Sequence, residues 1–270
     1  MQDLRNKWIL ITGAASGIGR ALAIEFAAQG ANIIMADIDE EGMKNTAAEV
    51  RAKGVKTISI KADVTRPGDL DKLAQTAVEE TGGLDILVNN AGIGMVSEMK
   101  NTLWEEWEKI LAVNLHAPIQ LTLRLLPHMI KKGRGHIVNI ASMAGLMGIP
   151  GMAQYSVTKF GLVGLSEALR TELHSYGIKV TAVCPGIVRT PILQTSRIKG
   201  FDEEMRTPPP GMSISPERAA RAIVKGVKRN KAKVITSALP KLIYALKIIA
   251  PGLVGLAGRK AYSRWKRVPI

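Results

Sequence analysis

Tyr155 and Lys159 are the residues whose types and spacing most directly suggest chemistry. Positions four apart lie on one face of a helix. A free tyrosine hydroxyl has a pKa near 10, too high for ready proton exchange at neutral pH. A cation held about 4 Å away contributes roughly 4 kcal/mol at an effective dielectric of about 20, which lowers that pKa by about three units. The spacing therefore predicts a general acid/base, although exposed helix pairs also have it.

A glycine-rich stretch, Thr12-Gly13-Ala14-Ala15-Ser16-Gly17-Ile18-Gly19, follows an apolar run of strand length and opens a helical pattern. Glycines let the chain turn tightly and let a pyrophosphate approach the N–H groups at a helix N-terminus. Ordinary turns also use glycine. The strand–turn–helix context makes nucleotide binding the better interpretation.

Asp37 stands at the end of the next strand-like run, 18 residues beyond Gly19. An acid at this place accepts hydrogen bonds from the adenosine ribose hydroxyls and repels a 2′-phosphate. Ser16 leaves the glycine stretch without a basic residue to hold that phosphate. An aspartate that merely shapes a turn is the alternative. Taken together, the two features favour NAD over NADP.

The elements that must position these residues alternate along the chain. We expect strands over 8–12, 32–36, 57–60, 86–88, 136–140 and 179–183, with a short edge strand over 234–235. Helical patterns lie between them, including 18–29, 40–53, 67–80 and a Ser215-capped helix over 216–228. Such alternation implies right-handed crossovers and a parallel sheet. We therefore predict an α/β fold: a single doubly wound Rossmann-type domain over residues 1–236, with helices on both faces of the sheet.

Positive charge is concentrated at one end of the chain. The 37 Lys and Arg exceed the 23 Asp and Glu by 14, and residues 218–270 hold 14 basic residues and no acidic one. Such asymmetry suggests a basic surface for a membrane or a nucleic acid. A solvated helical tail is the alternative.

Cysteine and histidine usage bounds the compartment and the metal chemistry. The lone Cys184 excludes an intramolecular disulfide framework and fits a reducing compartment. The four histidines are scattered, so we expect no metal site. The N-terminal residues lack the apolar core of a secretory signal. We therefore expect a cytoplasmic protein.

The glycine stretch and the Tyr155–Lys159 pair occur in order with Asn89-Asn90-Ala91-Gly92, Ser142 and Pro185-Gly186. This combination resembles the short-chain dehydrogenase/reductase family over about residues 7–235. The resemblance implies hydride transfer between NAD(H) and an alcohol or ketone. It implies that Tyr155 is the general acid/base, that Ser142 binds the substrate oxygen, that Lys159 lowers the tyrosine pKa and holds the nicotinamide ribose, and that Asn114 positions a water in the proton relay. The cofactor-binding positions that it implies are Gly13, Ser16, Gly17, Ile18, Gly19, Asp37, Asp63, Val64, Asn89, Ala91, Gly92, Tyr155, Lys159, Pro185, Gly186, Ile187 and Thr190.

The segments expected to line a substrate pocket are 94–96, 143–152 and 187–212. They contain six of the 11 methionines, namely Met95, Met143, Met147, Met152, Met205 and Met212. Methionine fills irregular apolar surfaces and accommodates varied ligands. No basic residue occurs in 143–152, which argues against an anionic head group there. We favour a hydrophobic secondary alcohol or ketone (lipid, steroid-like or terpenoid), with ordinary core packing of the methionines as the alternative.

Two segments lack the regular alternation. Residues 190–215 contain three consecutive prolines, so we expect a mobile loop. Residues 239–258, in the extension over 237–270, have the length of a membrane span but are interrupted by Lys241, Lys247 and two prolines. Lysines at the centre of a span cost about 2.5–3.5 kcal/mol each, so we favour an amphipathic helix that lies in a membrane interface, with basic residues from Arg259 to Arg267 at the headgroups. A tail packed over the substrate pocket or on a partner subunit is the alternative.

Other function classes remain open from sequence. A dinucleotide-binding sensor or scaffold could keep the fold without turnover, although it would not need the whole Ser142, Tyr155 and Lys159 set. Nucleic-acid binding through the basic tail is disfavoured because aromatic residues are not interleaved with the basic ones. We expect a homodimer or a homotetramer.

Overall fold

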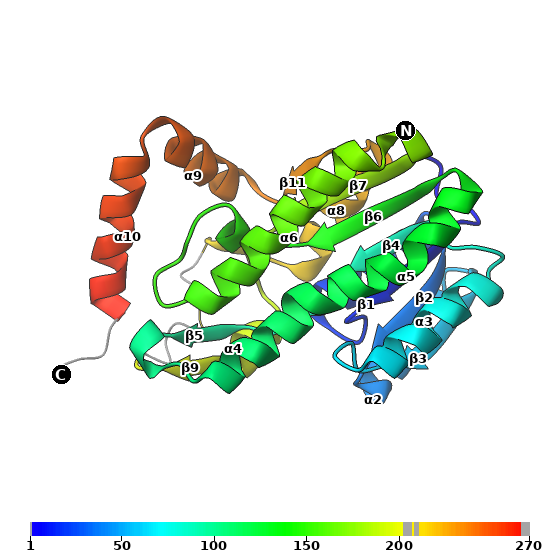
Figure 1. Ribbon diagram of the computed structural model, residues 1–270, viewed down its shortest axis with the longest axis horizontal. Helices are drawn as coiled ribbons and strands as arrows, with labels where there is room; N and C mark the ends of the chain where they lie inside the picture. Colours follow the sequence, from blue (N-terminus) through cyan, green and yellow to red (C-terminus); the bar gives the residue numbers. More distant parts are fainter. Residues whose placement is uncertain (1, 202–206, 208–210, 266–270) are drawn as a thin grey trace.

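The computed structural model describes residues 2–201, 207 and 211–265, and its centre is a seven-stranded parallel sheet between two layers of helices (Figure 1). The spatial order of the strands is β11-β7-β6-β4-β1-β2-β3. Their bounds are β1 Trp8–Thr12, β2 Asn32–Asp37, β3 Thr57–Lys61, β4 Ile86–Asn89, β6 Gly135–Ile140, β7 Ile178–Cys184 and β11 Lys233–Ile235. The predicted doubly wound α/β fold is confirmed. The strand order reverses between β1 and β4, where such sheets hold their ligands.

Each face of the sheet is covered by a layer of helices. One layer contains α1 (Gly17–Ala28), α2 (Glu40–Arg51) and α8 (Pro216–Lys228), and the other α3 (Pro67–Glu79), α5 (Ala117–Lys132) and α6 (Ala153–Glu172). Successive strand side chains point to opposite faces, so Ile9 and Ile11 of β1 join the first core while Leu10 joins the second. A sheet buried on both sides explains why its strands are continuous apolar runs.

Residues 190–215 contain more regular structure than the expected loop. The described part holds a short helix, α7 (Ile192–Thr195), and two strands, β9 (Arg197–Lys199) and β10 (Ser213–Ile214). These strands pair in parallel with β5 (Met95–Ser97) and β8 (Ile187–Val188) respectively. Distant partners supply the ladders, which the proline-rich local sequence could not reveal. The triple proline, Pro208–Pro210, and Met205 lie outside the described residues.

Shorter helical elements connect the main ones. Helix α4 (Trp104–Leu111) leads into a π-helical turn, η2 (Ala112–His116), which continues into α5. Three 3-10 turns, η1 (Met99–Asn101), η3 (Met143–Gly145) and η4 (His174–Tyr176), lie in connections. Of these, η3 follows β6 directly and begins beside Ser142.

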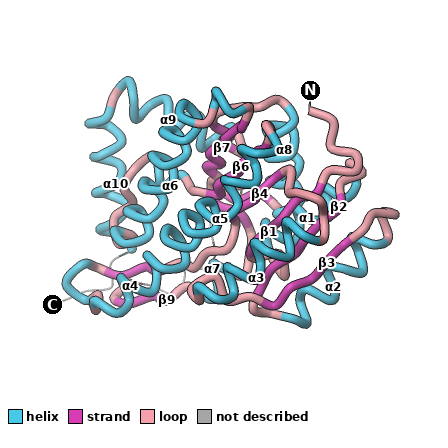
Figure 2. Tube along the Cα trace, turned by 45° about the vertical axis from the view of Figure 1, so that its right-hand side comes forward, coloured by secondary structure: helices cyan, strands magenta, loops and turns pink. Residues whose placement is uncertain are grey.

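The C-terminal residues form two helices, α9 (Ala238–Ile249) and α10 (Pro251–Trp265), instead of the single interfacial helix expected over 239–258. The helices are bent by 120° at Ala250 and Pro251, because proline lacks an N–H and disrupts the preceding turn. They lie at the end of the molecule opposite β3 and α2 in both views (Figures 1 and 2). Within the described ranges, no single helix is long and apolar enough to cross a membrane, and only α9 with the start of α10 passes that test as a bent pair.

Candidate active site

The ends of β1 and β4 are tied together where the strand order reverses. The amide of Asn90 donates from Nδ2 to the carbonyls of Thr12 at 2.9 Å and Gly13 at 3.0 Å. In return, Oγ1 of Thr12 accepts from the N–H groups of Asn90 at 3.0 Å and Ala91 at 3.1 Å. These hydrogen bonds fix the glycine turn beside the segment that follows β4. Sequence reasoning did not assign this role to Thr12 or Asn90, although a hydroxyl and an amide at two neighbouring strand ends were a usable signal.

The glycine turn leaves an open cradle at the N-terminus of α1. Gly13 and Gly17 have φ angles of +67° and +53°, which favour glycine. A Cβ at Gly19 would overlap the carbonyl oxygen of Gly13, so this position excludes any side chain. Ser16 is exposed as the helix N-cap, and its side chain makes no capping bond, while Ile18 packs against the core. Free N–H groups and the helix dipole at such a place favour a phosphate, so the residues fit a dinucleotide.

Two carboxylates flank the cradle. Asp37, at the end of β2, accepts from the N–H of Ala15 at 2.9 Å and from that of Asp39 at 3.1 Å. Asp63, after β3, accepts from the N–H and the hydroxyl of Thr65 at 2.9 and 2.7 Å. The bonds from Thr65 hold the pKa of the Asp63 carboxyl below its usual value. Asp37 is thus held against the glycine turn at the carboxyl end of β2, the place from which it is expected to bind the adenosine ribose.

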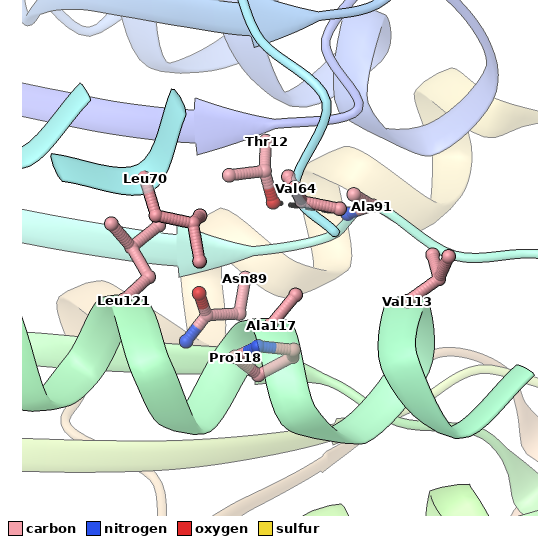
Figure 3. A pocket seen from close by; sticks show the side chains of 9 residues that line it. All are labelled: Thr12, Val64, Leu70, Asn89, Ala91, Val113, Ala117, Pro118 and Leu121. Carbon is pink, nitrogen blue, oxygen red and sulfur yellow. Dashed lines mark hydrogen bonds between the residues drawn. The ribbon is translucent and has the colours of Figure 1, made fainter. Parts of the chain in front are cut away.

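A narrow crevice lies beside Val64, between β4, α3 and α5 (Figure 3). Its volume of about 10 Å³ holds at most about one water. Asn89 faces this interior, where its Nδ2 donates to Oδ1 of Asn139 at 2.8 Å. The Asn89 side chain is therefore engaged within the sheet, and the crevice is too small for a nucleotide base. The residues that line it are Thr12, Val64, Leu70, Asn89, Ala91, Val113, Ala117, Pro118 and Leu121.

The expected catalytic residues come from the end of β6, from η2 and from α6. Lys159 is buried, and its Nζ donates to the carbonyl of Ile140, the last residue of β6, at 3.0 Å. The same Nζ lies 5.5 Å from the ring centroid of Tyr155. Ser142 lies just beyond β6, and its Oγ accepts from the N–H of Ala144 at 3.1 Å.

Asn114 occupies the π-helical turn η2 and is fully buried. Its Oδ1 accepts from the N–H of Ile93 at 2.8 Å, and its Nδ2 donates to the carbonyl of the same residue at 2.9 Å. A Cβ built on Gly92 would lie 3.3 Å from Oδ1 of Asn114 and 3.6 Å from Nζ of Lys159. Asn114 and Lys159 therefore both lie beside Gly92, where an added side chain would crowd Oδ1 of Asn114. Single π turns of this kind often occur at functional sites.

Burial sets the protonation behaviour of the tyrosine and the lysine. It lowers the pKa of Lys159 from 10.5 to about 8. It raises the pKa of Tyr155 above 10, and a hydrogen bond with Ser142 acts in the opposite direction. Removal from water is the larger of these two influences on Tyr155. That Lys159 lowers the tyrosine pKa stays a prediction.

The segment after β7 reaches the cradle from the other side. The carbonyl of Pro185 accepts from the N–H of Met143 at 2.9 Å, which ties this segment to η3. A Cβ built on Gly17 would lie 3.1 Å from Cγ2 of Thr190. Ile187 is 36% exposed, and Gly186 packs closely against Pro240 at the start of α9. The positions expected near the nicotinamide therefore border both the glycine turn and the serine.

The segments expected to line a substrate pocket also converge. The N–H of Ser97, in β5 directly after the 94–96 segment, donates to the carbonyl of Gly151 in the 143–152 segment at 2.7 Å. Met95 is buried, Met143, Met147 and Met152 are partly buried, and Met212 is 42% exposed. Cys184 is buried at the end of β7, and burial raises the pKa of its thiol to about 12, so it is not a ready nucleophile.

Comparisons with known proteins agree with this geometry. Residues 7–199 match the family model for short chain dehydrogenases. The ketoacyl reductase HetN of Nostoc sp. is 36% identical over 259 residues, which cover 93% of this chain and 88% of that protein.

Solved structures give the same result. A short chain dehydrogenase/reductase from Burkholderia phymatum in complex with NAD superposes with a TM-score of 0.83 at 25% identity, covering 94% of this chain and 96% of that one. The 3-ketoacyl-(acyl-carrier-protein) reductase from Brucella melitensis complexed with NADH gives a TM-score of 0.76 at 31% identity, covering 86% of this chain and 97% of that one.

Proposed function

This chain belongs to the short-chain dehydrogenase/reductase family and is an oxidoreductase, and from that premise we propose that it uses NAD(H) to interconvert a hydrophobic secondary alcohol and its ketone. The observation that carries the proposal is the convergence of Ser142, Tyr155 and Lys159 beside the glycine cradle. A sensor or scaffold on the same fold would have no use for the buried lysine, which costs stability.

The residues of the cradle would hold the dinucleotide. The N–H groups that open α1 would bind the pyrophosphate, and Gly19 leaves room for its approach. Asp37 would accept from the adenosine ribose hydroxyls and disfavour a 2′-phosphate. NAD and NADH in the related structures support this cofactor over NADP. When bound, the nicotinamide supplies or accepts the hydride.

The protein's own groups would handle the proton. The hydroxyl of Tyr155 would protonate the carbonyl oxygen during reduction or deprotonate the alcohol during oxidation. The hydroxyl of Ser142 would donate to the same oxygen and stabilise the charge that develops there. Lys159, held by the carbonyl of Ile140, would place a positive charge near the tyrosinate. Asn114 would hold the backbone at Ile93 and position a water for the relay.

The proposed substrate is lipid-like, steroid-like or terpenoid. Methionines 95, 143, 147 and 152 gather on the segments joined at Ser97 and Gly151. This supports an apolar ligand, since methionine adapts its shape to varied surfaces. Relatives named as ketoacyl reductases support a ketone on a hydrophobic chain.

We further propose a homodimer or homotetramer that works in the cytoplasm and associates peripherally with membranes. Helices α4, α5 and α6 lie on one side of the molecule (Figure 1), where Trp104, Leu123 and Val157 are 65%, 62% and 49% exposed. Exposed apolar side chains on adjacent helices support an interface between copies. The reduced, buried Cys184 supports a reducing compartment.

A substrate panel tests the proposed activity. Purified protein is mixed with NAD⁺ and apolar secondary alcohols, or with NADH and the matching ketones, and the nicotinamide absorbance is followed. Turnover with at least one apolar pair, faster than with small polar alcohols, is the expected result. Tight NAD(H) binding with no turnover on any member of the panel would favour the sensor instead.

A further inference from the structure

Helix α9 presents two different faces. Pro240, Tyr244 and Lys247 are four and three residues apart, so they share one face, and this face contacts the body. Pro240 packs on Gly186, and Nζ of Lys247 donates to the carbonyl of Leu146 while lying 5.5 Å above the ring of Phe160. The rest of the protein thereby binds the ammonium group of Lys247, the charge that would otherwise interrupt the apolar surface near the C-terminal end of the helix.

The other face of α9 is apolar and exposed. Leu239, Leu242, Leu246 and Ile249 recur at helical spacing and are 40%, 67%, 43% and 82% exposed. Lys241, between the two faces, is exposed as well. An apolar stripe of this length on a globular protein indicates an interaction surface.

Helix α10 repeats the arrangement. Tyr262 faces the body, where its hydroxyl donates to Glu98 and its ring packs edge-on against Phe201 at 5.8 Å between centroids. Leu253 and Leu256 lie on the side of the helix roughly opposite to Tyr262, and they are 61% and 58% exposed. Arg259 and Lys260 follow in the next turn and are exposed. We call the exposed residues Leu239, Leu242, Leu246, Ile249, Leu253 and Leu256, with Lys241, Arg259 and Lys260, the tail surface.

The charge on this part of the chain selects the partner. Residues 218–270 contain 14 basic residues and no acidic one. Two copies that met through the tail surface would bring like charges together without carboxylates in the tail to pair them. An anionic lipid surface offers both an apolar layer for the leucines and negative headgroups for Lys241, Arg259 and Lys260.

We propose that the tail surface docks this enzyme on an anionic lipid bilayer, in the plane of the interface. At about 1.5 Å per residue, helices of 12 and 15 residues measure about 18 and 22 Å, short of the roughly 30 Å hydrocarbon core. The 120° bend at Pro251 also prevents them from forming one straight span. The helices therefore lie on the membrane.

Docking places lipid beside the catalytic segments. The inner side of the tail touches Leu146 after η3, Gly186 after β7 and Glu98 after β5. These segments border Ser142 and the converging methionines. This step rests on the proposed function: docking would hold an apolar substrate dissolved in the bilayer close to the segments that border the catalytic residues.

The test is co-sedimentation of the full chain with vesicles of phosphatidylcholine, with and without phosphatidylserine. Leu242→Ser with Ile249→Ser should lower the partition coefficient about 100-fold on anionic vesicles, because two apolar side chains leave the interface. Arg259→Gln with Lys260→Gln should lower it about 30-fold on anionic vesicles and leave binding to neutral vesicles unchanged. Tyr176→Ser, at a 47% exposed residue at the amino end of β7, at the other end of this strand from Gly186, is the matched control and should bind as the wild type does.

Each variant is first compared with the wild type in thermal unfolding, NAD⁺ titration and native mass. Wild-type protein that stays in the supernatant with anionic vesicles would overturn the proposal, as would unchanged partitioning of both double variants. A lower native mass for Leu242→Ser with Ile249→Ser in the absence of lipid would also overturn it and assign the tail surface to a contact between copies. Vesicle binding requires no turnover, so its failure is distinguishable from failure of the proposed oxidoreductase activity, which the substrate panel measures without vesicles.

Discussion

Lys159 should destabilise the folded protein at neutral pH, and this cost should vanish in alkali. Its side chain is buried, and burial lowers its pKa from 10.5 to about 8. Between these values the unfolded chain binds a proton that the folded chain has released, so the free energy of unfolding rises with pH across this window. Below about pH 8 the full cost is present. At about 1.36 kcal/mol per pKa unit, it amounts to about 3 kcal/mol.

Replacing the lysine by methionine isolates this cost. Lys159→Met also removes the hydrogen bond to Ile140, but that loss is similar at every pH. The difference in free energy of unfolding between variant and wild type should therefore move by about 3 kcal/mol against the variant as the pH rises from about 7 to about 10.5. Urea unfolding of the cofactor-free protein at several pH values measures it. Lys53→Met, at an exposed lysine, is the control.

A difference that stays constant with pH would refute the reasoning. It would mean that Lys159 is solvated or paired in solution, and that no buried charge is kept near Tyr155. The expected result would show that the fold sacrifices stability to hold a cation where a tyrosinate must form, as functional sites often do.

Three further predictions concern a buried histidine, the cofactor and the glycine cradle. His136 is buried, and burial with Lys179 and Arg170 nearby lowers its pKa from 6.5 to about 3. As the pH falls, the unfolded chain therefore binds a proton at this histidine before the folded chain does. The free energy of unfolding should fall by about 5 kcal/mol between pH 6.5 and 3. His136→Gln should remove that loss and lower the midpoint of acid unfolding, and an unmoved midpoint would contradict this. Asp37→Ser should reduce the preference for NAD(H) over NADP(H) by about tenfold, equivalent to about 1.4 kcal/mol, in calorimetric titrations of both cofactors; a wild type that binds NADP(H) equally well would mean that Asp37 does not face the ribose. Gly19→Ala should abolish NAD⁺ binding because its Cβ would overlap the carbonyl of Gly13. Gly68→Ala, on α3 where a Cβ meets open space, should bind NAD⁺ normally, and its free energy of unfolding in denaturant should rise by roughly 0.5–1 kcal/mol.

The sheet and its helices were largely predictable because their signals are local. Strands buried on both faces give continuous apolar runs, so β1, β2, β6 and β7 were expected to within one residue at each end. The α8 prediction is confirmed with its cap, since Oγ of Ser215 accepts from the N–H of Arg218 at 3.2 Å. Caps and periodicity require only neighbouring residues.

The features that sequence reasoning missed depend on residues far apart in the chain. Strand β9 exists because β5 lies beside it, and 102 positions separate Met95 from its partner Arg197. The tie between Asn90 and Thr12 likewise joins two strand ends across 78 positions. The burial that raises the pKa of Tyr155 likewise depends on packing between distant segments. The division at residue 236 and the roles of the individual site residues stay predictions.

The most direct test of the central claim is the turnover of Tyr155→Phe on the substrate identified by the panel, measured with its affinity for NAD⁺. Loss of the hydroxyl removes the proposed proton donor and leaves the glycine cradle in place. We expect kcat to fall by at least the roughly 10²–10⁴-fold typical of general acid–base catalysis, with the Kd for NAD⁺ unchanged. A variant that kept the wild-type kcat would show that Tyr155 is not the acid/base and would contradict the account.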